Sequence, residues 1–109
     1  MTIELPPPIA NYFAVDGRGD PSGVARHFTD DAVVRDEGHT YTGHAAIAQW
    51  KADSSTKYQY AVEPFAIANE AEATVVTAHL TGDFPGSPVD LRYRFALDGD
   101  RIASLEIAV

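Results

Sequence analysis

The sequence contains no cysteine and no long apolar run. Without cysteine there are no disulfides, no zinc sites with thiolate ligands and no thiol catalysis, as is common in a reducing compartment. No segment approaches the ~20 consecutive apolar residues that cross a bilayer, so we expect no transmembrane helix. The first residues, MTIELPPPIANYF, include neither a basic segment nor a long apolar one. We therefore predict no signal peptide and a cytoplasmic location.

Basic residues are also scarce, with eight lysines and arginines against sixteen aspartates and glutamates and a formal net charge of -8. An anionic surface repels phosphate backbones and anionic lipids, so we expect neither nucleic acid nor a membrane as a partner. The chain has 109 residues, of which 45% are hydrophobic. This length and composition predict one globular domain over residues 1–109.

Apolar residues recur at helical spacing in the first half of the chain and predict three helices. The first contains Tyr12 and ends at a glycine, and the second begins at an Asp-Pro pair that suits a helix N-terminus. The third has Trp50 on its apolar stripe. The expected helices cover about residues 8–17, 20–28 and 44–54.

The remaining segments alternate apolar and polar residues, which is the period of a β-strand. A short strand ends at Asp36, and a Glu-Gly turn separates it from a second short strand. Four longer strands follow with short breaks between them, so we expect antiparallel neighbours. The expected strands cover residues 32–36, 40–42, 58–68, 72–81, 88–97 and 101–109. The predicted fold class is α+β: helices first, then a long, curved antiparallel sheet.

The strand over 88–97 has an apolar face and a charged face. Leu91 and Phe95 belong to the apolar face, and we expect them in the core together with Ile47, Trp50 and Leu105. The charged face contains Asp90, Arg92 and Arg94. Charged ladders of this kind usually face solvent.

Several segments are typical of one protein family when taken in order: FTDDAVVRDEG, the helix start at Gly43–Ile47, Trp50 and FPGSPVDLRYRF. With this order of elements, the chain resembles the NTF2-like superfamily, which includes SnoaL-like polyketide cyclases and ketosteroid isomerases. The resemblance implies a cone in which three N-terminal helices close a curved antiparallel sheet around an apolar ligand pocket. It also implies a homodimer through the outer sheet face, where Arg92 and Arg94 lie.

The resemblance to ketosteroid isomerases is closest at two residues. Tyr12 matches their oxyanion-hole tyrosine and Asp36 matches their general-base aspartate, with the same separation of 24 residues. The resemblance therefore implies that Asp36 moves a proton while Tyr12 stabilises the negative oxygen that forms. Their third catalytic group, a protonated aspartate, aligns with Leu91, and Asp90 lies one residue away. Half of the oxyanion hole is thus expected to be missing.

Each candidate also has a purely structural interpretation. Asp36 begins a favourable Asp-Glu-Gly turn sequence, and Tyr12 suits a core position with its hydroxyl satisfied. His39 is either an acid or base at the pocket entrance or a solvated turn residue. The sequence is compatible with His79 on either face of its strand, toward the pocket or toward solvent.

The pocket wall is expected to be largely aromatic. Its candidate residues are His39, Tyr41, Trp50, Tyr93 and Phe84, the last in a proline-rich loop at the rim. Acidic and histidine residues also gather between 36 and 44, but they lack the spacing of known metal motifs. We therefore predict no metal and no cofactor.

Two functions are compatible with these features. The first is a cone-fold protein that binds a small apolar or carbonyl-bearing molecule and moves a proton on it, as an isomerase or cyclase. The second is a non-catalytic ligand-binding or dimeric interaction module of the same fold, because function depends on the site and not on the fold. The positions of Asp36 and Tyr12 relative to one cavity distinguish them.

Overall fold

The computed structural model describes residues 4–17, 21–36, 38–57, 60–70 and 73–108. These residues form three helices and a six-stranded sheet. The elements are, in chain order, α1 (Pro7–Gly17), α2 (Pro21–Arg26), β1 (Phe28–Asp36), β2 (His39–Thr42), α3 (His44–Lys57), β3 (Tyr60–Glu70), β4 (Ala73–Gly82), β5 (Val89–Asp98) and β6 (Arg101–Ala108). Within the described residues, no helix has both the length and the apolar character needed to cross a membrane.

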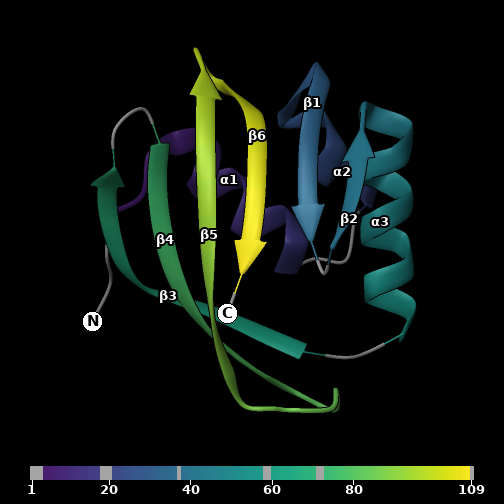
Figure 1. Cartoon of the computed structure of the whole chain (residues 1–109), viewed down its shortest axis with the longest axis vertical. Helices are drawn as coiled ribbons and strands as arrows, with labels where there is room; N and C mark the ends of the chain where they lie inside the picture. Colours follow the sequence, from purple (N-terminus) through teal and green to yellow (C-terminus); the bar gives the residue numbers. More distant parts are fainter. Residues whose placement is uncertain (1–3, 18–20, 37, 58–59, 71–72, 109) are drawn as a thin grey trace.

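The strands form one sheet in the order β2-β1-β6-β5-β4-β3. Figure 1 shows α1 and α2 behind the sheet, α3 beside β2, and a strong bend in the long strands β3, β4 and β5. Each successive pair from β3 to β6 is antiparallel, as the short connections predicted. The curved sheet therefore has an inner face toward the helices and an outer face away from them.

One pair of strands corrects the expected antiparallel sheet, because β1 and β6 are parallel neighbours. Val34 lies opposite Leu105, and Asp36 lies opposite Ile107. The prediction was wrong here because a short turn sets the direction only of strands that follow one another, whereas α3 and four strands separate β1 from β6. α3 follows β1 and β2, in the order that the expected residue ranges gave, so only α1 and α2, and not all three helices, precede the sheet.

The core lies between the helices and the inner face of the sheet. Tyr12, Phe28 and Phe95 are the largest of its fully buried side chains. The five residues expected in the interior are confirmed there. Ile47, Trp50, Phe95 and Leu105 are buried, and Leu91 packs against them half-buried.

β1 is longer than the sequence pattern predicts, because it begins at Phe28 rather than at Ala32. The polar run Thr29–Asp31 interrupts the apolar alternation and hides the start of the strand in the sequence. Phe28 therefore belongs to the strand and not to a helix. It is fully buried and lies opposite Ile102 of β6.

A β-bulge changes which side chains of β6 face the core. Leu97 lies opposite Ile102, but Ala96 lies opposite Ser104, so one residue of β6 is extra. The extra residue allows Ile102 and Leu105 both to be buried, although strict alternation would put them on opposite faces.

β3 is the long outer edge of the sheet, and a second bulge interrupts it at Pro64. Pro64 lies opposite Ala78 and Ala66 lies opposite Thr77, so Phe65 is the extra residue. Its ring is 48% exposed. Proline has no backbone N–H for the ladder, and strands tolerate it at an edge or a bulge, where that donor is not needed.

We predict that Trp50→Ala lowers the free energy of unfolding by about 3–5 kcal/mol, because it removes a large buried ring. Urea unfolding followed by circular dichroism measures this change. Phe65→Ala is the control, since its exposed ring should contribute less than about 1 kcal/mol. A similarly small loss for Trp50→Ala would contradict the buried position of its ring.

Candidate functional site

Asp36 is the last residue of β1, half-buried beside the turn into β2. Gly38 shapes this turn with a φ of 78°, in the left-handed region that residues with a side chain rarely adopt. Asp36 pairs with His39 across the turn, and Val34 pairs with Tyr41. Because opposite residues share a sheet face, these side chains lie on the same face as the buried Val34.

Trp50 of α3 connects Asp36 to the core. Its indole Nε1–H donates a hydrogen bond to Asp36 Oδ2 at 3.0 Å. The ring of Trp50 is buried, and its centre lies 6.0 Å from that of Tyr41. This hydrogen bond holds the carboxylate of Asp36 in one orientation.

Lys51 is a candidate that the sequence analysis missed. It is the one buried charged residue among those that the structure describes, with 5% of its surface exposed. Its Nζ lies 4.3 Å from the ring centre of Trp50 and 5.3 Å from that of Tyr12, so the cation contacts two aromatic faces. Helical spacing could have indicated it, because Lys51 follows Ile47 by four residues and so lies on the buried stripe.

Tyr12 of α1 is fully buried within a cluster of aromatic rings. The ring centres lie 5.1 Å (Phe13), 6.0 Å (Phe28), 6.5 Å (Tyr93) and 5.5 Å (Phe95) from that of Tyr12. Two residues of α3 connect this cluster to Asp36: the Lys51 ammonium group contacts the rings of Tyr12 and Trp50, and Trp50 donates its hydrogen bond to Asp36. Tyr12 and Asp36 are therefore linked through α3.

A cavity of about 320 Å³ opens beside Asp36, where the parallel strands β1 and β6 both end. Residues 35–36, 38–40 and 106–108 form its wall. This wall brings Asp36 together with His39 and does not include Tyr12. Among the described residues, no group of three or more histidine, aspartate or glutamate side chains is placed to hold a metal ion.

The other predicted residues lie away from this cavity. Tyr93 is buried in the aromatic cluster, and Phe84 is half-buried against the core. Leu91 faces the core, whereas Asp90 lies on the outer face and its Oδ1 is 2.7 Å from Nδ1 of His79. This contact assigns His79 to the outer face. It also keeps the carboxyl group of Asp90 away from Tyr12.

Comparisons with known proteins agree with this architecture. Residues 9–105 match the family model of the SnoaL-like domain. No curated protein matches the chain in sequence. The structure of a candidate polyketide cyclase from Sinorhizobium meliloti is 38% identical with a TM-score of 0.90, and the match covers 95% of each chain.

Two more distant structures share the fold. A protein of Catenulispora acidiphila with a ketosteroid isomerase-like fold, in complex with trimethylamine, is 19% identical with a TM-score of 0.85, covering 97% of this chain and 87% of that one. SalBIII, an epoxide hydrolase/cyclase-like enzyme of pyran ring formation in salinomycin, is 19% identical with a TM-score of 0.77, covering 92% and 85%. At this identity the likeness establishes the fold alone.

We predict a measurable coupling between Trp50 and Asp36 in a double-mutant cycle. Trp50→Phe removes the N–H donor and keeps an aromatic ring, and Asp36→Ala removes the acceptor. Because the hydrogen bond reaches a charged acceptor at a half-buried site, the coupling in the free energy of unfolding should be about 1–3 kcal/mol.

The control for this cycle is the pair Arg35 and Glu106. Their charged atoms approach only to 4.0 Å at an exposed position. Replacing both with alanine in a second cycle should give a coupling of about 0.5 kcal/mol or less. Couplings of equal size in the two cycles would argue against the hydrogen bond between Trp50 and Asp36.

Proposed function

This chain belongs to the SnoaL-like domain family, and on that basis we propose that it catalyses proton transfer on a small, carbonyl-bearing apolar molecule, as an isomerase or a cyclase. The main support is the hydrogen bond from Trp50 to Asp36, which orients a carboxylate beside a cavity. His39, the cross-strand partner of Asp36, lines the same cavity. A base and a second proton-carrying group at one cavity meet the requirement for general acid–base catalysis.

The cavity suits a small substrate. Its volume of about 320 Å³ lies at the lower end of the range for ligand sites, roughly 300–1,000 Å³. The wall has an apolar part (Ile107 and Ala108), uncharged polar groups (Thr40 and His39) and charged groups (Arg35, Asp36 and Glu106). A small molecule with an apolar body and a carbonyl group can contact the apolar part while its carbonyl group lies toward the polar residues.

In the proposed reaction, Asp36 removes a proton from the carbon next to the carbonyl group. The electrons of that C–H bond form a carbon–carbon double bond, and the carbonyl oxygen becomes an enolate that accepts a hydrogen bond from His39. In an isomerase, the protonated Asp36 then returns the proton to a different carbon. In a cyclase, the enolate carbon instead attacks a second carbonyl carbon of the same molecule and closes a ring. The π electrons of that second carbonyl group move to its oxygen, which takes the proton from Asp36 and becomes a hydroxyl group.

Lys51 and Tyr12 support this reaction from the interior side of Trp50. The Lys51 ammonium group lies over the Trp50 ring, so its charge polarises the ring whose N–H holds Asp36. Tyr12 packs against the same ammonium group. We assign positioning roles to these two residues, and we keep the Tyr12 hydroxyl as the alternative donor to the enolate oxygen.

The related protein of Sinorhizobium meliloti favours the cyclase form of this proposal. It bears the name of a candidate polyketide cyclase and is 38% identical over 95% of each chain. Polyketide chains contain several carbonyl groups, so one proton transfer can produce the carbon nucleophile for ring closure. Substrates with two carbonyl groups are therefore the first to test.

A non-catalytic ligand-binding module is the second candidate. One observation favours it: Tyr12 lies in the aromatic cluster and is not part of the cavity wall beside Asp36. Without a donor from Tyr12, the cavity has one fewer group to stabilise an enolate. Binding of a carbonyl compound without turnover would support this alternative.

We predict that Asp36→Asn lowers isomerisation or proton-exchange rates on a responsive carbonyl compound by about 10²–10⁴-fold, because asparagine cannot act as the base. The melting temperature should change little, since asparagine keeps the turn and a hydrogen-bond acceptor for Trp50. A panel of enolisable ketones, diketones and epoxides, followed by proton exchange in deuterated water, measures the effect.

Further variants identify the donor and test the alternative function. His39→Gln should lower the rate if His39 is the donor, and Tyr12→Phe should do so if the hydroxyl of Tyr12 is. His79→Gln is the control, because His79 bonds to Asp90 on the outer face and should leave the rate unchanged. Activity that survives Asp36→Asn would exclude Asp36 as the base. Binding without turnover across the panel would favour the non-catalytic module.

We also propose that the protein is a homodimer through the outer face of its sheet. Glu70 on that face bonds to both Arg94, at 3.1 Å, and Arg92, at 3.5 Å. Charges of both signs on one face can complement their own copies across a two-fold axis.

Sedimentation velocity at high micromolar concentration should therefore show a dimer. We predict that Arg94→Glu shifts the protein toward monomer, because it reverses one charge of the face that must complement its own copy. Arg26→Glu is the control, since it makes the same charge change on α2, on the other side of the sheet from its outer face (Figure 1). A wild-type protein that stays monomeric would refute the dimer.

A further inference from the structure

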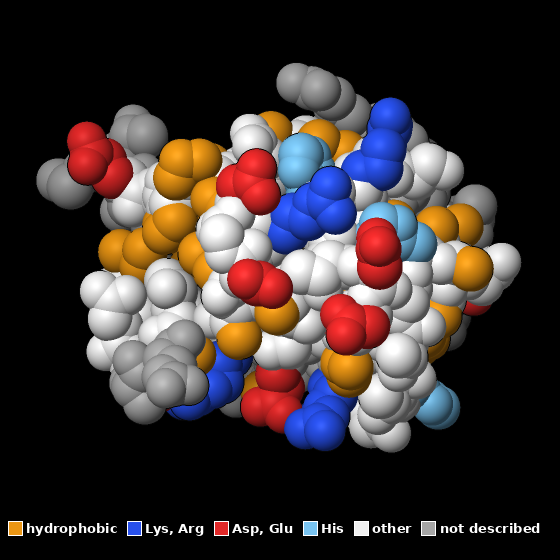
Figure 2. Space-filling model, turned by 90° about the horizontal axis from the view of Figure 1, so that it is seen from above, with side chains coloured by type: hydrophobic (Ala, Val, Ile, Leu, Met, Phe, Trp, Pro, Cys, Tyr) orange, Lys and Arg blue, Asp and Glu red, His pale blue; other side chains and the backbone are white. Residues whose placement is uncertain are grey.

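A second cavity lies at the opposite end of β1 from Asp36. Its volume is about 270 Å³, and its wall comes from the start of α1, the end of α2 and the turn between β5 and β6. Figure 2 views the molecule from the end where β1 and β6 begin, and it shows basic and His side chains close together with acidic side chains around them. The proposed reaction uses no residue of this cavity.

Three side chains in the wall of this cavity can bear positive charge: Arg26, His27 and Arg101. They come from separate parts of the fold, since Arg26 ends α2 and Arg101 begins β6. The whole chain has only eight lysines and arginines against sixteen acidic residues. The two arginines therefore place positive charge at one small cavity of a protein whose net charge is negative. Asn11 adds an uncharged amide donor to the same wall.

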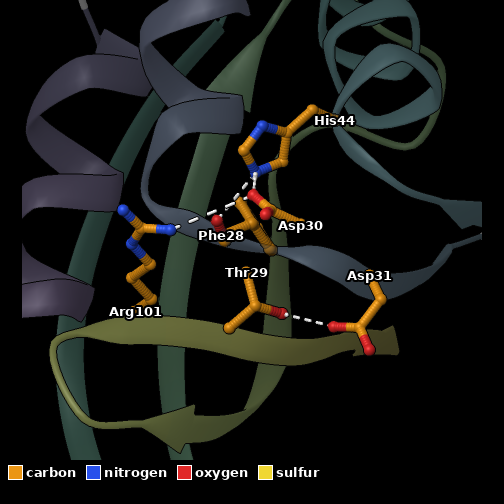
Figure 3. A network of polar contacts seen from close by, with 6 residues as sticks. All are labelled: Phe28, Thr29, Asp30, Asp31, His44 and Arg101. Atoms are coloured by element: carbon orange, nitrogen blue, oxygen red, sulfur yellow. Dashed lines mark hydrogen bonds and ion pairs between the residues drawn. The ribbon is translucent and has the colours of Figure 1, made fainter.

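Arg101 is only weakly held by its acidic neighbour. Its Nη1 lies 4.0 Å from Oδ1 of Asp30, whose side chain is 91% exposed. The same Asp30 oxygen lies 3.8 Å from Nε2 of His44, which is closer to the carbonyl oxygen of Phe28, at 2.8 Å (Figure 3). Exposed pairs at such distances contribute little free energy, so an incoming anion can compete with Asp30 for Arg101.

We propose that this cavity binds a small phosphate-type oxyanion, either free phosphate or the phosphate group of a small ester. The planar guanidinium groups of Arg26 and Arg101 can each donate paired hydrogen bonds to a tetrahedral oxyanion. His27 and Asn11 supply further donors. Two guanidinium groups favour a doubly charged phosphate over a singly charged carboxylate. The small volume limits the rest of the ligand.

One residue of the wall opposes anion binding. Asp100 lines the cavity next to Arg101, and its carboxylate repels an oxyanion. The site should therefore be weak in the wild-type protein, and neutralising this carboxylate should strengthen it. Stronger binding after removal of this one carboxylate would indicate a defined site at these residues and not a nonspecific attraction of anions to arginine.

The test is a titration of the ¹⁵N-labelled protein with inorganic phosphate at constant ionic strength, followed by backbone amide shifts. We expect saturable shifts around residues 26–27 and 100–101, with a Kd on the order of 10 mM or tighter. Arg26→Gln and Arg101→Gln should each weaken binding by about tenfold or more. Asp100→Asn should tighten it by about two- to fivefold. Arg35→Gln, which removes the same charge at the other end of β1, should not change it.

The ligand class is tested with further arms of the same titration. Glycerol phosphate binding more tightly than inorganic phosphate would identify a phosphate ester as the natural ligand, and equal or weaker binding would identify free phosphate. Acetate that binds as tightly as phosphate would overturn the proposal. So would shifts that rise linearly without saturating, or binding that is unchanged in both arginine variants. Because the readout is binding at residues away from Asp36, its outcome is independent of the proposed catalytic activity.

Discussion

The parallel pairing of β1 with β6 is the contact on which the rest of the structure depends. It joins the first strand to the last and fixes Phe28 opposite Ile102 at one end and Asp36 opposite Ile107 at the other. Both cavities lie at the ends of this pair, where the strands leave the sheet and side chains from turns and helices meet them. The candidate catalytic end and the candidate anion-binding end are thus two consequences of one strand pairing.

Local patterns predicted most of this fold, and long-range contacts account for what they missed. Period-two alternation located the strands, and helical spacing placed Trp50 in the core. Neither pattern contains information about which distant strand lies beside β1 or in which direction it runs. The sequence pattern did not predict the burial of Ile102, because that burial follows from a bulge in the pairing of β6 with β5.

The candidate site was predictable where residues are close in sequence. Asp36, His39 and Tyr41 surround one turn, so the sequence could predict that they lie together, and they do. The position of Tyr12 depends on how α1 packs against β5, which no local pattern encodes. Lys51 was missed because lysine is almost always solvated, whereas here its buried ammonium group contacts rings from two different helices.

The bulge at Pro64 has a consequence for the pairing of this sheet with a second molecule. The outer edge of β3 is eleven residues long and would otherwise offer a second molecule a continuous row of backbone donors and acceptors. Pro64 removes one donor from that row, and the bulge interrupts its register. The opposite edge, β2, has only four residues. Neither edge therefore offers a second molecule a long, regular row of backbone groups for strand addition.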